Sequence, residues 1–546
     1  MRLFSAYFLI ILTAYTPFIL NGGFGPGDDL SLIYSTVHNE LGIISILKGS
    51  IVGGTSSARP VSMLIRSIVL NSFKDNPTPY IILQLCLWFA SIGFIFNIIR
   101  FSMSNSIAWI FLLLASFPIF SSTIVFSPYL LAEYGLPIFF WTLSLFFLKS
   151  YISHSRVYCY LLAYFFLVLA LLSLSIILPL LIITSLLPII LESHIKQIPL
   201  SKTASRLSVK YVIPVILIAT SFFIYKLSTS TYGLAPIDIK SFLQAIYYFF
   251  VILIEIPLLL IEVFPHLFKL HNLILAILIV IFFVFLRERT SICENKTTRK
   301  LKSSKERLFV SVVLISLCSC SILFFLSQYP ATTFGHYNRM MLPSLILYSV
   351  LLAWVVQKML FSRLVVFPIC ISIFWVSSMI IQLNGFVESW NTREKILTDC
   401  VSKLNKVELG NNPYLIACVP FYNKKNYNNE EVFWFTWATS RGLKLFGLKQ
   451  SVNVFPVCWR TLIDSTFNPN HNILNYIFPL PKEADYWYYE FDQVSGNSKL
   501  EKVSEKENIE QIFQHIVNNK INFHPLIPRE RIRIMLKRKV LDNIFL

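Results

Sequence analysis

The acidic residues best suited to chemistry follow the first apolar segment of the chain. Asp28 and Asp29 lie at the end of the glycine-rich stretch 22–29, and Glu40 follows in a segment with the spacing of an amphipathic helix. Neighbouring carboxylates that lose hydration repel one another, and their pKa values rise unless a cation or a hydroxyl compensates. They then suit the role of a general base or a metal ligand. The competing interpretation is that one aspartate caps the helix that starts near Leu30.

Cationic side chains stand at the ends of other apolar segments. Arg59 precedes a proline, and His336 and Arg339 lie three residues apart. Because arginine can bind a phosphate through two parallel hydrogen bonds, we predict that Arg59, Arg339 and His336 form a phosphate site. Snorkelling toward lipid headgroups is the alternative for Arg59. Glu133, the sole charge in the turn 127–134, either supports the site and its acceptor or caps the next helix.

The segments that must position these residues are strongly apolar. Of the 546 residues, 55% are hydrophobic and 14% are charged, whereas soluble domains have about 25% charged residues. Segments long enough to cross a bilayer recur throughout residues 1–384. We expect about 11 transmembrane helices, near 3–20, 77–99, 104–125, 135–150, 157–191 (two helices, divided near Ser173, Ser175 and Pro179), 211–226, 271–286, 308–327, 340–357 and 364–383.

The lysine and arginine residues orient these segments. Of the 26 basic residues before position 385, 18 fall in loops on one side, which the positive-inside rule makes cytoplasmic. The acidic pair, Arg59, Glu133 and Arg339 then share the exoplasmic side. A full span at 241–263 would invert the loops that follow, so we expect this segment, with Glu255 and Glu262 on one helical face, to be re-entrant or interfacial.

The composition changes near residue 384. The last 162 residues hold 17 of the 29 acidic residues, together with turn residues and aromatic clusters. We therefore predict a transmembrane catalytic domain over 1–384 and an exoplasmic α/β domain over 385–546. Its aromatic residues fit either core packing or sugar binding. The net charge of +18 lies mostly in the cytoplasmic loops, which argues against nucleic-acid binding.

No resident metal or cofactor is indicated. The nine cysteines are scattered without a C-x-x-C pair or a His/Cys cluster. Binding of a divalent cation stays possible only at the carboxylate pair Asp28 and Asp29.

Carboxylates and cations that share the outer face of a membrane indicate a group-transfer enzyme. Because nucleotide sugars are absent from that side, a glycosyl transfer there needs a donor carried across already activated, such as a sugar on a polyprenyl phosphate. Arginines would stabilise the departing lipid phosphate while an aspartate removes the proton of the acceptor hydroxyl.

The arrangement resembles a known family over about residues 15–65. One span is followed by Gly25-Pro26-Gly27-Asp28-Asp29-Leu30, an amphipathic segment and Ala58-Arg59-Pro60. It is similar to the GT-C superfamily of polytopic glycosyltransferases, and most closely to the phage-type O-antigen glucosyltransferases, which modify lipopolysaccharide. The segment from His336 to Pro343 agrees more loosely with that superfamily.

The resemblance implies a GT-C-like transmembrane fold in a bacterial inner membrane with a periplasmic C-terminal domain. It implies an undecaprenyl-phosphate-linked glucose donor and a periplasmic glycan acceptor such as lipopolysaccharide O-antigen. It also implies catalytic roles for Asp28, Asp29 and Glu40. Nothing in residues 385–546 matches a recognisable motif.

Two other functions stay open. An O-antigen polymerase or ligase also has many spans and outer arginines, but it has no special need for paired carboxylates after the first span. A transporter or flippase for lipid-linked glycans predicts charges deep within several spans and halves of related sequence. A structural scaffold leaves the clustered carboxylates unexplained.

Overall fold

The structure is a computed structural model of the whole chain. It describes residues 2–21, 23, 33–34, 59–118, 135–196, 200–229, 270–291, 299–327, 342–360, 366–418, 436–456, 484–492 and 495–503.

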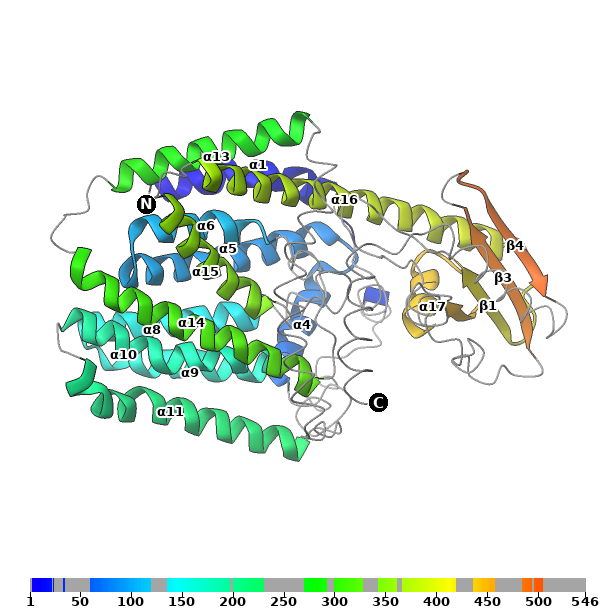
Figure 1. Cartoon of the computed structure of the whole chain (residues 1–546). Coiled ribbons are helices and arrows are strands. Elements are labelled where there is room, and N and C mark those ends of the chain that lie inside the picture. The colour runs from blue at the N-terminus through cyan, green and yellow to red at the C-terminus, as the bar shows by residue number, and fades with distance from the viewer. Residues whose placement is uncertain are drawn as a thin grey trace, which may run out of the picture.

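Helices make up most of the described chain. They are α1 (Arg2–Asn21), α4 (Pro60–Phe73), α5 (Pro77–Ser102), α6 (Asn105–Ser116), α8 (Leu136–His154), α9 (Val157–Ser173), the 3-10 helix η3 (Ser175–Leu180), α10 (Leu181–Ile195), α11 (Leu200–Thr229), α13 (Leu270–Ser291), α14 (Arg299–Ser327), α15 (Leu342–Leu360) and α16 (Val366–Leu404). Figure 1 shows them side by side in one bundle, with a small sheet beyond one end. We call that end of the bundle the sheet-side end and the opposite one the far end.

Several of these helices can cross a membrane. Six described helices are long and apolar enough, and five more are apolar but no longer than 17 residues. This confirms the coarser part of the predicted fold, a mostly helical protein with several membrane-crossing segments. The predicted division of 157–191 is also confirmed, because α9 ends at Ser173 and η3 begins at Ser175. The total of about 11 spans stays a prediction.

One helix lies where the sequence indicated only an outer loop. Helix α4 has Pro60 at its first turn, a position that proline favours because its fixed φ suits a helix start. Ile65 and Val69 on α4 pack with Leu136 of α8, and other α4 residues contact α9. In this way α4 crosses the sheet-side end of the bundle.

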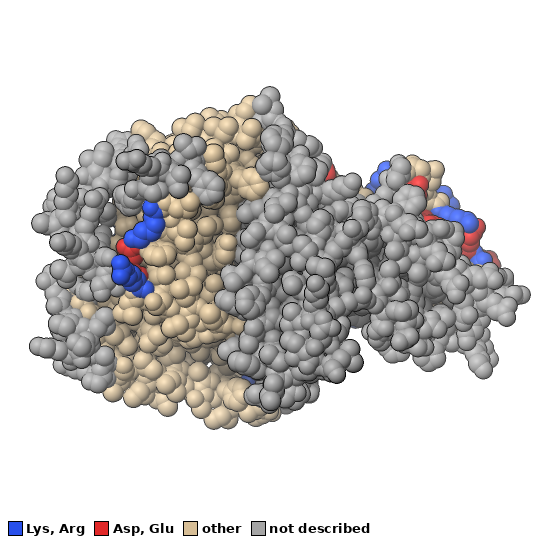
Figure 2. Space-filling view, in the orientation of Figure 1, with Lys and Arg blue, Asp and Glu red and all other residues tan. Residues whose placement is uncertain are grey.

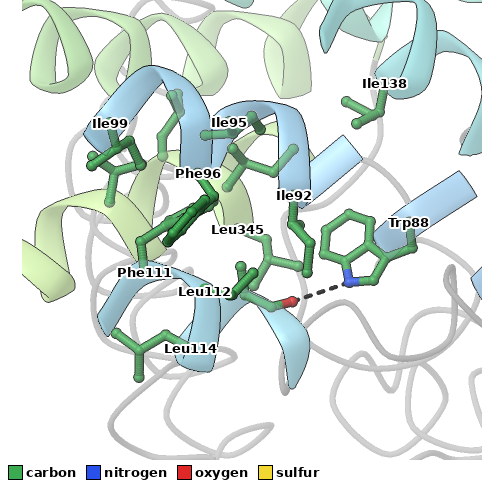
Figure 3. Packing of buried hydrophobic residues seen from close by; sticks show 14 of the residues in the cluster. Trp88, Ile92, Ile95, Phe96, Ile99, Phe111, Leu112, Leu114, Ile138 and Leu345 are labelled. Carbon is green, nitrogen blue, oxygen red and sulfur yellow. Dashed lines mark hydrogen bonds between the residues drawn. The ribbon is translucent and has the colours of Figure 1, made fainter. Parts of the chain in front are cut away.

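A continuous apolar core fills the bundle. Figure 3 shows close packing among Phe96, Phe111 and Leu345, which come from α5, α6 and α15. Large apolar residues of α9 and α11 point outward instead, among them Leu161 and Ile216, each more than half exposed. An apolar outer surface over an apolar core is the pattern of helices that face lipid.

Helix α6 ends inside the bundle. Its 12 residues extend for about 18 Å, less than the roughly 30 Å of a hydrocarbon core. The carbonyl oxygens at its end accept hydrogen bonds from Tyr15 (to Ser116, 2.5 Å), Trp88 (to Ala115, 3.0 Å; Figure 3) and Trp375 (to Leu114, 3.1 Å, and Phe117, 2.9 Å). Because unpaired backbone groups are costly in lipid, these donors let the helix stop there. The remainder of the predicted span 104–125, from residue 119 on, lies outside the described residues.

The sheet joins the bundle through α16. Its strands β1 (Pro413–Cys418), β2 (Asn453–Pro456), β3 (Asp485–Phe491) and β4 (Ser498–Val503) run in the order β2-β1-β3-β4. β1 is parallel to β2 and β3, while β4 is antiparallel to β3. The short helix α17 (Thr436–Leu445) packs on β2.

Helix α16 belongs to both parts of the molecule. Its first half packs in the bundle through Trp375 and Met379, and its last turns pack under the sheet through Leu397 and Val401. The expected boundary between residues 384 and 385 thus falls inside one continuous helix (Figure 1). The two-domain division and the exoplasmic location of the second domain stay proposals.

Candidate functional site

Two cationic side chains, those of Arg59 and Lys226, lie at the sheet-side end of the bundle (Figure 1). The ammonium group of Lys226 donates a hydrogen bond of 2.9 Å to the hydroxyl of Ser175. The positive charge of Arg59 lies close enough to act on Lys226 electrostatically. All three side chains are half-buried. We call Arg59, Ser175 and Lys226 the cation site.

Each member of the cation site stands at the end of a helical element. Arg59 is the N-cap residue of α4, Ser175 begins η3 after the break at Leu174, and Lys226 lies in the last turn of α11. Helix α4 contacts α9, and α9 contacts α11, which brings together residues that are far apart in the sequence. A polar side chain at the end of a helix can bind a ligand at the membrane surface, and the cost of placing its charge in the apolar core is avoided.

Cations whose charges act on one another repel, and an anion bound by both relieves that repulsion. Phosphate is a suitable anion, because arginine offers it two donors in a fixed fork and lysine offers it a compact point charge. The Ser175 hydroxyl adds a further donor or acceptor. The geometry therefore suits the binding of a phosphate group at the end of an apolar bundle.

The charged residues at the far end are arranged differently. The Glu192 carboxylate, whose side chain is 5% exposed, accepts hydrogen bonds from Lys196, Lys210 (3.0 Å) and Tyr211 (2.5 Å). Glu306 pairs with Lys358 at 2.8 Å in the same way. Figure 2 shows a group of blue and red side chains at this end, beside a wide tan surface. The lysines that pair with Glu192 and Glu306 are thus matched by carboxylates, which indicates a structural role for these pairs.

The described residues place one of the predicted site residues, Arg59, and it lies in the cation site. The other predicted residues fall outside the described parts of the chain, as does the segment 241–263 with Glu255 and Glu262; they are Asp28, Asp29, Glu40, Glu133, His336 and Arg339.

Two points that flank the acidic pair in the sequence are described. Gly23 lies against α16, where a Cβ atom on this glycine would be 3.1 Å from the Cβ atom of Trp390. On the other side of the pair, Ile33 packs with Leu70 and Tyr80, and Lys444 of α17 lies over the Tyr34 ring at 5.9 Å. Asp28 and Asp29 are thus connected in sequence to two anchors at the sheet-side end.

Lys226 and Ser175 were not among the predicted site residues. A lone lysine at the end of an apolar segment is usually an interfacial anchor, and the serine was informative only as a helix break. Their meeting depends on the contacts of α9 with α11, which the sequence alone does not reveal. The described residues contain no group of three or more His, Cys, Asp or Glu side chains that could hold a metal ion.

Comparison with known proteins does not place the chain in a family. No protein-family model matches it, and no curated protein sequence matches it. Among solved structures it is similar to the crystal structure of ArnT from Cupriavidus metallidurans in the apo state, at 9% sequence identity and a TM-score of 0.38, over 90% of this chain and 93% of that chain. A TM-score this low does not establish a common fold, so we base the function on the residues of this chain.

Proposed function

We propose that this chain is a membrane glycosyltransferase that takes its sugar from a polyprenyl-phosphate-linked donor. The observation that carries the proposal is the placement of Arg59 and of Lys226, which is hydrogen-bonded to Ser175, at one end of an apolar helical bundle. A site that is cationic and next to a membrane suits a ligand that is both a phosphate and a lipid. The acidic pair of the first loop supplies the base that the transfer needs.

The reaction replaces one bond at the anomeric carbon of the sugar by another. A carboxylate of Asp28 or Asp29 takes the proton of an acceptor hydroxyl, and the oxygen of that hydroxyl bonds to the anomeric carbon. The bond from this carbon to the phosphate oxygen breaks, and the lipid phosphate leaves with the electron pair. Arg59 and Lys226 stabilise the negative charge that develops on the phosphate.

The remaining predicted residues take supporting roles in this proposal. Glu40 assists the aspartates, Arg339 and His336 join Arg59 at the phosphate, and Glu133 supports the acceptor side. A glucose donor, a periplasmic glycan acceptor such as lipopolysaccharide O-antigen and a bacterial inner membrane are the finer expectations, and they rest on the resemblance over residues 15–65.

The position of the described charges favours a transferase over a flippase. A flippase needs charged groups along a path through the membrane. Among the described residues the buried charged side chains are Glu192 and Arg393, and Glu192 is neutralised by two lysines near the far end of α10. An O-antigen polymerase or ligase stays the second enzymatic candidate. Its product would differ from that of a glycosyltransferase.

The acidic pair provides the direct test. We would purify Asp28→Asn and Asp29→Asn and measure transfer of labelled sugar from a polyprenyl phosphate sugar to glycan. We expect a loss of about 100-fold or more in the variant that lacks the base, since general-base catalysis contributes about 10²–10⁴. Asp75→Asn is the matched control, because Asp75 is an exposed acid in the turn between α4 and α5. Full activity in both Asp28 and Asp29 variants would remove the basis of the proposal.

Product analysis separates the remaining candidates. One added side-branch sugar supports the glycosyltransferase, and joined repeat units support a polymerase. Lipid translocation by the reconstituted protein without sugar transfer would support a flippase.

A further inference from the structure

We propose that a groove between α9 and α11 holds the part of the polyprenyl chain nearest the donor phosphate, with Lys226 and Arg59 at that phosphate. The inference rests on the proposed function and deepens it, because it assigns Lys226 and the groove to the lipid half of the donor.

The groove is apolar and of suitable size. It encloses about 390 Å³ and is lined by Val168, Leu171 and Leu172 of α9 and by Leu217, Phe222 and Tyr225 of α11, among others. This volume lies near the lower end of the roughly 300–1,000 Å³ found for small-molecule sites. A space of this size, lined almost entirely by apolar side chains, suits a stretch of hydrocarbon chain.

The groove opens toward the surrounding lipid. Leu217 lines it and is nevertheless 61% exposed, and Val168 is 36% exposed. Helix α11 is also the least buried of the six helices that can cross a membrane. A lipid chain can therefore enter sideways from the bilayer, and the protein need not open to admit it.

The apolar groove leads to the cation site. Tyr225 lines the groove, and Lys226 is the next residue on α11. The Lys226 ammonium donates its hydrogen bond to Ser175, and the positive charge of Arg59 acts on it electrostatically. An apolar channel with two cations at one end is complementary to a molecule with a hydrocarbon chain and an anionic head. The proposed donor is such a molecule.

The length of the groove limits how much of the chain it binds. Leu217 and Tyr225 are eight residues apart on α11, which corresponds to about 12 Å along a helix and to less than half of a hydrocarbon core of roughly 30 Å. The groove therefore contacts only the isoprene units next to the phosphate. We expect donors with chains of a few isoprene units to be accepted nearly as well as long ones.

A matched pair of variants tests the groove. Ser221→Trp fills it from an exposed, lining position, whereas Ile216→Trp adds the same bulk on the exposed side of α11 that faces away from the lining residues. In nanodiscs, we expect Ser221→Trp to raise the KM for the polyprenyl phosphate sugar about tenfold, equivalent to about 1.4 kcal/mol, at nearly unchanged kcat. Ile216→Trp should leave KM within about twofold of the wild type. Equal KM values for the two variants at equal thermal stability would overturn the proposal.

Photo-crosslinking locates the lipid without depending on turnover. A polyprenyl phosphate with a diazirine on its first isoprene unit should label peptides of α9 and α11. Excess unlabelled polyprenyl phosphate should displace it, and phosphatidylglycerol should not. Lys226→Gln should weaken labelling about tenfold, and Lys226→Arg should restore most of it.

The outcomes separate the groove from the function. Labelling elsewhere with normal sugar transfer overturns the groove and leaves the glycosyltransferase intact. Labelling in the groove without sugar transfer in any assay supports the lipid site and counts against the glycosyltransferase. Displacement by phosphatidylglycerol, or crosslinks between two copies of the chain through α11, would show that a bilayer lipid or a second copy covers this surface.

Discussion

At the scale of single residues, the chemistry proposed for this protein depends on where the charged side chains are placed. Glu192 and Glu306 hold lysines at the far end, and at the sheet-side end the positive charge of Arg59 acts on Lys226. The types and spacing of residues predicted Arg59 as a phosphate ligand, because an arginine before a proline follows the acidic loop. Lys226 was not predicted, because Ser175 and Arg59 are distant from it in the sequence. A single lysine after an apolar segment does not indicate which residues will lie near it in the fold.

Arg59 at the start of α4 and Arg66 within it allow a test of the cation site. We expect Arg59→Gln to weaken the binding of polyprenyl phosphate by about 10- to 100-fold, because hydrogen bonds to charged groups contribute about 1.5–3 kcal/mol. Arg59→Lys should recover part of the affinity, since lysine keeps the charge without the fork. Arg66→Gln is the control, because the Arg66 guanidinium contacts the sulfur of Met63 one turn away. Titration of nanodisc-embedded protein with labelled lipid phosphate measures all three, and an Arg66 effect as large as that of Arg59 would contradict the assignment.

The far-end cluster should contribute to stability and leave the binding of lipid phosphate unchanged. Glu192→Gln removes the charge that holds Lys196 on α10 and Lys210 on α11, and we expect a loss of about 1–3 kcal/mol in the free energy of unfolding. Glu394→Gln, at an exposed position of α16, should change it by less than about 0.5 kcal/mol. Thermal unfolding in detergent measures the change. A loss of lipid-phosphate affinity in Glu192→Gln at unchanged stability would contradict the division between the two ends.

At the scale of elements, the apolar pattern predicted where helices run better than where they stop. The division at Ser173 and Ser175 was predictable, since polar residues and a proline interrupt a run too long for one helix. The helix α4 was missed because its 14 residues are too few for a span. The end of α6 at Ser116 could not be read from the sequence either, because its donors come from α1, α5 and α16.

The indole donor on α16 offers a test of how α6 ends. Trp375→Phe removes the N–H that serves the carbonyl oxygens of Leu114 and Phe117, and we expect it to cost about 1–3 kcal/mol of stability. Trp109→Phe is the matched control, because the indole N–H of Trp109 is buried with no hydrogen-bond partner in the described structure. Scanning fluorimetry of the purified variants compares them. If Trp109→Phe destabilises as much as Trp375→Phe, loss of packing explains both and the donor is unimportant.

At the scale of the whole molecule, α16 links the membrane part to the sheet. The sequence indicated a change of environment near Asn384 because charged residues begin there, yet the helix continues to Leu404. Polar residues do not end a helix when one face stays apolar, and Ile396, Leu397 and Val401 provide that face against the sheet. Burial is the main cause that raises the pKa of the Tyr489 phenol, so its hydroxyl stays protonated and donates to Asp399 of α16 at 2.8 Å. The sheet is thereby held on a helix that begins within the bundle.

The orientation of the molecule gives the last prediction. The acidic loop, the cation site and the sheet all lie toward one end in the proposed function, and the positive-inside rule puts that end outside the cytoplasm. Asp75→Cys and Ser155→Cys introduce thiols in exposed turns at opposite ends of the bundle, between α4 and α5 and between α8 and α9. In intact spheroplasts, a membrane-impermeant maleimide should label Asp75→Cys above the wild-type background and should label Ser155→Cys only after lysis. The reverse pattern would put the cation site on the cytoplasmic side, where nucleotide sugars are available, and would remove the reason for a lipid-linked donor.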